Sequence, residues 1–183
     1  MKTVRDPEER VGRLFEEHAA RLCAYARRHA DAQEAEDLVS EAFVVAMRRA
    51  DDLPEDAEVF AWLVGTVRRL AVNHRRRRAT RDRHWRDAVR DGWHHPTTAS
   101  PEDAIAERDA CLAALAALSE TDRELLLLTA WEGLTPRQAA QVLGLRPNTL
   151  SARLSRARRR MQAGLNPSTA SVLQLAPAEE LNR

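Results

Sequence analysis

The sequence predicts an all-α protein: two small helical domains joined by a flexible linker, with a helix-turn-helix in the C-terminal domain. The strong helix formers alanine, leucine, arginine and glutamate dominate the 183 residues. Runs of β-branched or aromatic residues, which favour strands, are rare, and aromatic residues contribute only 4%. Apolar residues recur at helical spacing along most of the chain. Because each helix is apolar on one side, each domain needs several helices around a shared core.

Domain boundaries follow from changes in composition. We place the first domain at residues 8–82, a linker at 83–103, the second domain at 104–165 and a tail at 166–183. The end of the linker is rich in glycine, proline and small polar residues and has no apolar periodicity, which is typical of a connecting segment. The tail contains proline, serine and alanine and is expected to be mobile.

Three amphipathic helices are expected in the first domain. They are predicted at residues 7–30, 32–50 and 57–78, and a loop interrupted by Pro54 precedes the third. The side chains expected to form their common core are Val11, Leu14, Phe15, His18, Leu22, Cys23, Tyr25, Ala26, Ala35, Leu38, Val39, Ala42, Phe43, Ala46, Phe60, Trp62, Leu63, Val67, Leu70 and Ala71.

Two helices are expected at the start of the second domain. The first is predicted at residues 102–118, and Ser119 is the predicted N-cap of the second, which ends at Gly133. The side chains of the first helix that are expected to face inward are Ile105, Leu112, Leu115 and Leu118.

Residues 134–160 have the pattern of a helix-turn-helix. Thr135 is a suitable N-cap, Pro136 a suitable first helical residue, and Gln138 completes a capping box. Gly144 supplies the positive φ that ends the first helix. On the second helix a single apolar stripe is expected at Leu150, Leu154, Ala157 and Met161, with Asn148, Thr149, Ser151, Arg153 and Arg156 facing outward. The pattern predicts DNA binding, with the second helix in the major groove; an ordinary helical hairpin with a solvated basic face is the alternative.

Charge is segregated along the chain although the net charge is only +1. Residues 31–60 contain ten acidic side chains and two arginines, whereas residues 68–90 contain ten arginines and two aspartates. Segregation of this kind predicts two kinds of partner, one basic and one polyanionic. Cys23 and Cys111 are expected to be reduced thiols, and no signal peptide or membrane-spanning apolar run is found, which predicts a cytoplasmic protein.

An enzyme is a poor match to the sequence. His84, His94, His95 and Cys111 could suggest a metal-dependent nuclease, but the histidines have no helical spacing to one another or to carboxylates. There is also no nucleophile–base pattern and no glycine-rich phosphate loop. We therefore expect no catalytic residue, no metal site and no cofactor.

Three motifs resemble those of a bacterial RNA polymerase sigma factor of the extracytoplasmic-function (ECF) group. Residues 36–43, Glu-Asp-Leu-Val-Ser-Glu-Ala-Phe, resemble region 2.2 of that family. Residues 60–63 and 70–76 resemble regions 2.3 and 2.4, and residues 118–160 resemble region 4. The order and spacing of these motifs carry the resemblance, which covers roughly residues 10–165. It implies a two-domain initiation factor that binds core RNA polymerase and promoter DNA.

The resemblance also implies which residues make contacts. Region 2.2 docks on a coiled coil of the β′ subunit in the family, which assigns Asp37, Leu38 and Glu41 to core polymerase docking. The β subunit and an anti-sigma factor are further partners of such proteins, and no residue of this chain identifies the latter. The −10 element is assigned to the loop at 51–58 and the helix after it, at Asp56, Trp62, Arg69, Asn73, Arg75, Arg76, Arg77 and Arg78.

The −35 element is assigned to the helix-turn-helix. Base edges are reachable from the start of its second helix, and later arginines are placed for phosphates. The assigned residues are Arg137, Arg146, Asn148, Thr149, Ser151, Arg153, Arg156, Arg158 and Arg159, with Arg160 as a further phosphate contact. Trp62 is the weakest member of the −10 set, because a core position explains it better than a stacking platform.

The chain departs from the family pattern at three places. Gly65 and Arg69 stand where the family often has arginine and asparagine, and that asparagine is tied to −10 recognition. Residues 150–152, Leu-Ser-Ala, replace a more polar Val-Lys-Ser. These differences bear on which promoter sequence the chain recognises, and less on the function that the resemblance implies. The competing interpretation is a conventional helix-turn-helix regulator, which would bind duplex DNA without polymerase.

Overall fold

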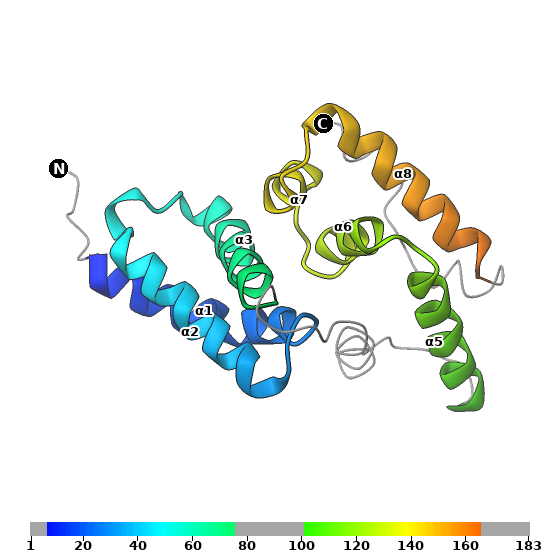
Figure 1. Cartoon of the computed structure of the whole chain (residues 1–183), viewed down its shortest axis with the longest axis horizontal. Coiled ribbons are helices and arrows are strands. Elements are labelled where there is room, and N and C mark those ends of the chain that lie inside the picture. Colours follow the sequence, from blue (N-terminus) through cyan, green and yellow to red (C-terminus); the bar gives the residue numbers. More distant parts are fainter. Residues whose placement is uncertain (1–6, 76–100, 166–183) are drawn as a thin grey trace. The chain divides into compact units, whose positions relative to one another are not determined.

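The computed structural model describes residues 7–75 and 101–165, and only the backbone at 101–104 and 147–148. Within these ranges the protein consists of α-helices and one short 3₁₀ helix, without strands. The chain divides into two compact units, Met1–Gly92 and Trp93–Arg183 (Figure 1). The all-α, two-domain prediction is confirmed. The predicted linker at 83–103, apart from its last three residues, and the tail at 166–183 lie outside the described residues.

The first unit is a bundle of three helices that pack against one another in pairs: α1 (Pro7–Ala26), α2 (Ala32–Arg48) and α3 (Asp56–Arg75). A 3₁₀ helix, η1 (Ala50–Asp52), connects α2 to α3. The helix α1 ends four residues earlier than predicted, because residues 27–30 form a turn. That turn leads to the N-cap of α2, where the Asp31 carboxylate accepts a hydrogen bond from the Glu34 backbone N–H at 2.9 Å.

The six residues predicted to be buried on α2 are all buried. The core also contains Leu22, Tyr25, Leu63 and Val64, which are completely inaccessible to solvent. Phe15 is an exception to the prediction: 47% of its surface is exposed, although its ring contacts Phe43 edge-on at 4.9 Å. The first unit therefore forms its core from the predicted faces of its helices, with Phe15 at its edge.

The second unit contains α5 (Pro101–Ala116), α6 (Glu120–Ala130), α7 (Pro136–Leu143) and α8 (Pro147–Ala163). The helices α6, α7 and α8 contact one another in all three pairings, and α5 packs against α8. Among residues 105–116 of α5 the first buried side chain is that of Cys111, so the prediction of an inward-facing Ile105 is wrong: its side chain is 52% exposed. Leu112, Leu115 and Leu118 are buried as expected.

The local signals of the helix-turn-helix are confirmed. Thr135 and Gln138 form the reciprocal capping box at the start of α7, and Ser119 caps α6. Gly144 adopts φ 66°, the left-handed conformation that a side chain would strain. Leu150, Leu154, Ala157 and Met161 are all buried on α8. The opposite side of α8 is therefore left for solvent or a partner.

The two thiols are both unpaired and differ in their environment. Burial raises the pKa of Cys111 to about 12. For Cys23, burial and the nearby Glu36 carboxylate raise the pKa, and Arg27 partly opposes them. Because the thiolate is the reactive form, we expect iodoacetamide at pH 8 to modify Cys23 at least about tenfold faster than Cys111. Mass spectrometry of peptides over time would measure both rates, and equal rates in the folded protein would contradict the prediction.

Candidate nucleic-acid and polymerase interfaces

The outer face of α2 carries the predicted docking acids. Asp37 and Glu41 are exposed, and their i, i+4 spacing places them one turn apart on the same side of the helix. Glu41 Oε2 lies 3.3 Å from His74 Nε2, and Glu34 Oε1 lies 3.7 Å from His74 Nδ1. His74, near the end of α3, therefore lies between two carboxylates of α2. The acidic face of α2 therefore contacts α3 through the His74 side chain.

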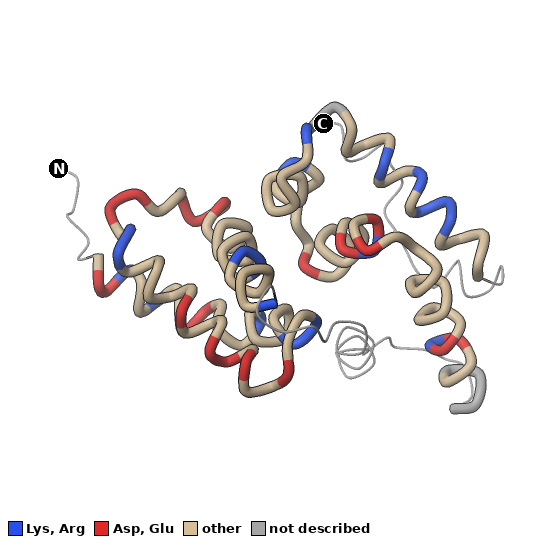
Figure 2. The backbone as a smooth tube through the Cα atoms, viewed as in Figure 1, with Lys and Arg blue, Asp and Glu red and all other residues tan. Residues whose placement is uncertain are grey.

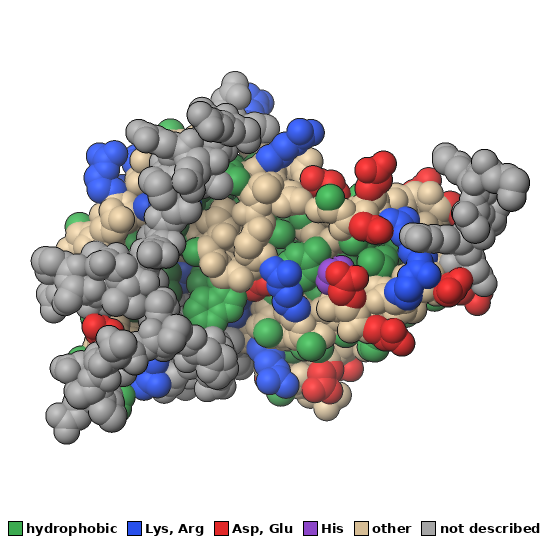
Figure 3. Space-filling model, turned by 180° about the vertical axis from the view of Figure 1, so that it is seen from behind, with side chains coloured by type: hydrophobic (Ala, Val, Ile, Leu, Met, Phe, Trp, Pro, Cys, Tyr) green, Lys and Arg blue, Asp and Glu red, His purple; other side chains and the backbone are tan. Residues whose placement is uncertain are grey.

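Apolar side chains continue the same face. Val44 and Met47 are 48% and 43% exposed, and Val44 follows Glu41 by one helical turn. On the other side of the first unit, which Figure 3 shows, apolar side chains likewise lie at the surface among acidic and basic ones. An interface commonly has an apolar centre and a charged rim. Sequence reasoning missed both residues, although their positions off the buried stripe of α2 could have revealed them.

The loop before α3 is held by a side chain of α1. Arg10 Nη2 donates to the Pro54 carbonyl oxygen at 2.5 Å and pairs with Asp56 Oδ1 at 3.3 Å. Arg10 Nη1 reaches the Leu53 carbonyl oxygen at 3.5 Å. Asp56, a predicted −10 residue, is thus exposed but already paired. The guanidinium of Arg10 fixes the backbone of this loop, which sequence reasoning did not anticipate.

The predicted DNA-facing residues of α3 are mostly accessible. Arg69 and Asn73 are exposed, whereas Trp62 and Arg75 are half-buried. Arg69 Nη2 donates to Thr66 Oγ1 at 3.0 Å, and Thr66 Oγ1 donates to the Trp62 carbonyl oxygen at 2.9 Å. The hydroxyl of Thr66 therefore holds the Arg69 guanidinium against the preceding turn of α3. Arg76, Arg77 and Arg78 lie outside the described residues.

The exposed side of α8 carries the predicted −35 residues. Arg146 is its N-cap, and the Arg146 carbonyl oxygen accepts a hydrogen bond from Thr149 Oγ1 at 2.8 Å. The exposed members are Arg146, Thr149, Ser151, Arg156, Arg159 and Arg160, together with Arg137 on α7. Arginines follow one another along this helix in Figure 2. The side chain of Asn148 lies outside the part of the chain that the structure describes.

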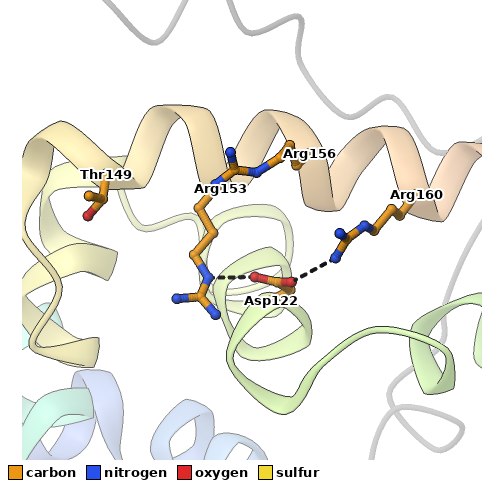
Figure 4. Close-up of a pocket in the computed structure, with 5 residues that line it drawn as sticks. All are labelled: Asp122, Thr149, Arg153, Arg156 and Arg160. Atoms are coloured by element: carbon orange, nitrogen blue, oxygen red, sulfur yellow. Dashed lines mark hydrogen bonds and ion pairs between the residues drawn. The ribbon is translucent and has the colours of Figure 1, made fainter.

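One acid of α6 pairs with two arginines of α8. Asp122 Oδ1 lies 2.6 Å from Arg153 Nε, and Asp122 Oδ2 lies 3.5 Å from Arg160 Nη1 (Figure 4). A hollow of about 460 Å³ is lined by these residues with Thr149 and Arg156. Burial alone raises the pKa of the Asp122 carboxyl, but hydrogen bonds from Arg153 and Ser119 and the charges of both arginines lower it below its ordinary value. Asp122 is therefore ionised near neutral pH.

Comparison with known proteins identifies the family. Residues 14–81 match the model of Sigma-70 region 2, and residues 108–161 match that of Sigma-70, region 4. The ECF RNA polymerase sigma factor SigL of Mycobacterium tuberculosis is 31% identical over 158 residues, which cover 83% of this chain and 86% of SigL. The chain belongs to the ECF sigma factors.

Two further proteins extend the comparison. The probable RNA polymerase sigma factor RfaY of Xanthomonas campestris is 33% identical over 132 residues, 70% of this chain but only 33% of RfaY. The structure of the sigma factor RpoE of Bartonella quintana, in complex with the anti-sigma factor NepR, shares the fold. It has a TM-score of 0.57 and 24% identity and covers 90% of this chain and 97% of RpoE.

Membership in this family establishes the general function of the chain. The chain is an RNA polymerase sigma factor: it binds core RNA polymerase, recognises promoter DNA and acts in transcription initiation. Sigma factors are regulatory proteins without enzymatic activity. Among the helices of residues 7–75 and 101–165, none has the length and apolar character needed to cross a membrane. No metal-binding cluster of histidine, cysteine and carboxylate side chains occurs in the same ranges.

Two of the residues that were predicted to make contacts in this sigma factor have buried side chains. Leu38 is completely inaccessible, because it lies on the buried stripe of α2, so its side chain is not part of the exposed acidic face. Arg158, predicted to contact a phosphate, is only 9% exposed. It lies one turn after Leu154 and next to Ala157 on the buried side of α8, and burial lowers its pKa. For Leu38 the docking assignment, which follows the family motif, conflicts with the core position that helical periodicity predicts for the same residue, whereas Arg158 was assigned to a phosphate by its charge.

Proposed function

We propose that the outer face of α2, formed by Asp37, Glu41 and Val44, docks on core polymerase. The exposed carboxylates provide charge complementarity for a basic helix of the partner, and Val44 supplies an apolar centre. The family places this contact on the β′ subunit. The exposure of this face, with the core residues of α2 all turned away from it, is the observation that supports the assignment.

We propose that promoter DNA is divided between the two units. The loop held by Arg10 and the exposed side chains of α3 bind the −10 element. An opened DNA strand needs a loop to hold an unstacked base and cationic side chains to contact its phosphates. The start of α8 enters the major groove of the −35 element, and Arg156 and Arg159 bind phosphates. The second unit supports this through its capped α7, the Gly144 turn and the arginines on α8.

The chain itself recognises the promoter and binds the opened DNA strand, and the polymerase catalyses RNA synthesis. The site of action is therefore the cytoplasm, where core polymerase and DNA meet. An anti-sigma factor is a further candidate partner of this chain. A surface that docks on polymerase is one that such an inhibitor would cover.

Run-off transcription with a genomic fragment library tests the proposed function. Purified core polymerase is mixed with the protein and DNA, and the transcripts are sequenced. We expect new start sites that share −10 and −35 elements and are absent when the protein is omitted. A conventional regulator would instead bind duplex DNA alone and yield no new starts with core polymerase, an outcome that would overturn the proposal.

A further inference from the structure

The carboxylate of Asp122 connects two helices of the second unit. Asp122 lies in the first turn of α6, where its backbone N–H donates to Ser119 Oγ at 3.2 Å, and only 7% of its surface is exposed. A buried carboxylate is costly unless it is paired. Both of its oxygens are occupied by α8, one by Arg153 and one by Arg160. The two arginines are separated by two turns, so they share one side of α8.

The pairing geometry leaves the outer end of Arg153 available. Its Nε–H faces Asp122 at 2.6 Å, whereas neither terminal amino group has a hydrogen bond within the described parts of the chain. The side chain is 35% exposed and lines the hollow beside Thr149 and Arg156. Figure 4 shows the Arg153 and Arg160 side chains directed from α8 toward Asp122. The terminal amino groups are those that bind the O6 and N7 atoms of guanine in pairs.

A fixed arginine and a free arginine differ in what they recognise. A guanidinium that is free to move can pair with any phosphate within its reach, and each such contact adds affinity that does not depend on sequence. A guanidinium held by a carboxylate loses less rotamer freedom on binding and presents its donors in one direction. Asp122 also cancels one positive charge in a hollow that otherwise contains three arginines. Its presence therefore disfavours indiscriminate binding of the DNA backbone.

We propose that Asp122 is a specificity-determining positioning residue, which directs Arg153 toward one base pair of the −35 element and restrains Arg160 from general phosphate binding. This inference rests on the proposed placement of α8 in the −35 major groove. It assigns a role in promoter selection to α6, a helix that does not itself enter the groove.

The near-isosteric variant Asp122→Asn tests both effects of the carboxylate. It removes the charge that holds both arginines while keeping the size of the side chain. Discrimination at the base pair read by Arg153 should fall about tenfold, within the range of one lost bidentate contact. Binding to non-promoter DNA should at the same time become tighter and more salt-dependent, because about one more cation faces the phosphates.

The experiment uses the complete protein in holoenzyme. Run-off transcripts are counted for a promoter library that carries every single-base change in the −35 element, and binding to non-promoter DNA is measured across salt concentrations. Asp109→Asn is the matched control, since it makes the same charge change on the exposed surface of α5, where the Asp109 side chain is 61% exposed. The control should leave base preference unchanged.

Two outcomes overturn the inference. In the first, Asp122→Asn lowers transcription from all −35 variants equally, together with the unfolding temperature, which is the result of a purely structural ion pair. In the second, base preference stays unchanged. If Asp122→Asn does not fold, Arg153→Lys decides: it keeps the charge pair but lacks the fork of donors, and it should relax preference at one base pair. If the proposed function itself is wrong, the wild-type protein yields no transcripts. That result differs from both outcomes that overturn the role of Asp122.

Discussion

Replacing Leu38 with alanine is expected to reduce the free energy of unfolding of the first unit by about 2–5 kcal/mol. The Leu38 side chain is completely inaccessible, in the middle of the buried stripe of α2. Its truncation loses the transfer free energy of the removed methyl groups and leaves a cavity that the three-helix core can only partly fill. Because small domains are marginally stable, a loss of this size is a large share of the total.

Thermal and urea unfolding followed by circular dichroism would measure this effect. Val44→Ala on the same helix is the control, because Val44 is 48% exposed and its truncation should change stability by no more than about 0.5 kcal/mol. The Leu38 variant should still bind core polymerase at temperatures where it is folded. A folded Leu38→Ala protein with weakened binding would show that Leu38 contacts the partner, contrary to its burial.

The sequence predicts best where a pattern is local. Every residue of α2 that helical periodicity assigns to the core is buried, and the capping box of α7 and the positive φ of Gly144 follow from two or three neighbouring residues. These features depend on backbone geometry within one or two turns. The family resemblance adds the function, and both parts of the family model match the chain.

The features that the sequence did not predict depend on how the helices pack against one another. The periodicity of a single helix carries no information about this packing. Ile105 has the spacing of a core residue, but the part of α5 that carries it lies before the buried segment that starts at Cys111. Arg158 is counted as surface by its charge, yet its position on α8 buries it. The Asp122–Arg153 pair joins residues 31 positions apart and could not be predicted from either helix alone. Arg10 holds the loop before α3 across 44 positions in the same way.

Reversing both docking charges, with Asp37→Arg and Glu41→Arg, is expected to weaken binding to core polymerase at least about tenfold. The two carboxylates are exposed and one turn apart, so both face a partner that lies along α2. Like charges placed together at an interface cost several kcal/mol, and steering of the encounter is also lost. Titration of fluorescently labelled protein with core polymerase would measure the dissociation constant.

The salt dependence distinguishes a charge effect from a folding effect. At 1 M salt the screening length falls to about 3 Å, so the affinities of the variant and the wild type should approach each other. Glu9→Arg with Glu16→Arg on α1 makes the same change of charge on another exposed surface and should leave binding unchanged. Glu41→Arg also removes the 3.3 Å contact with His74, so the single variant Asp37→Arg shows how much of the loss is due to docking alone. Normal binding by both the double and the single variant would place the polymerase contact elsewhere on the first unit.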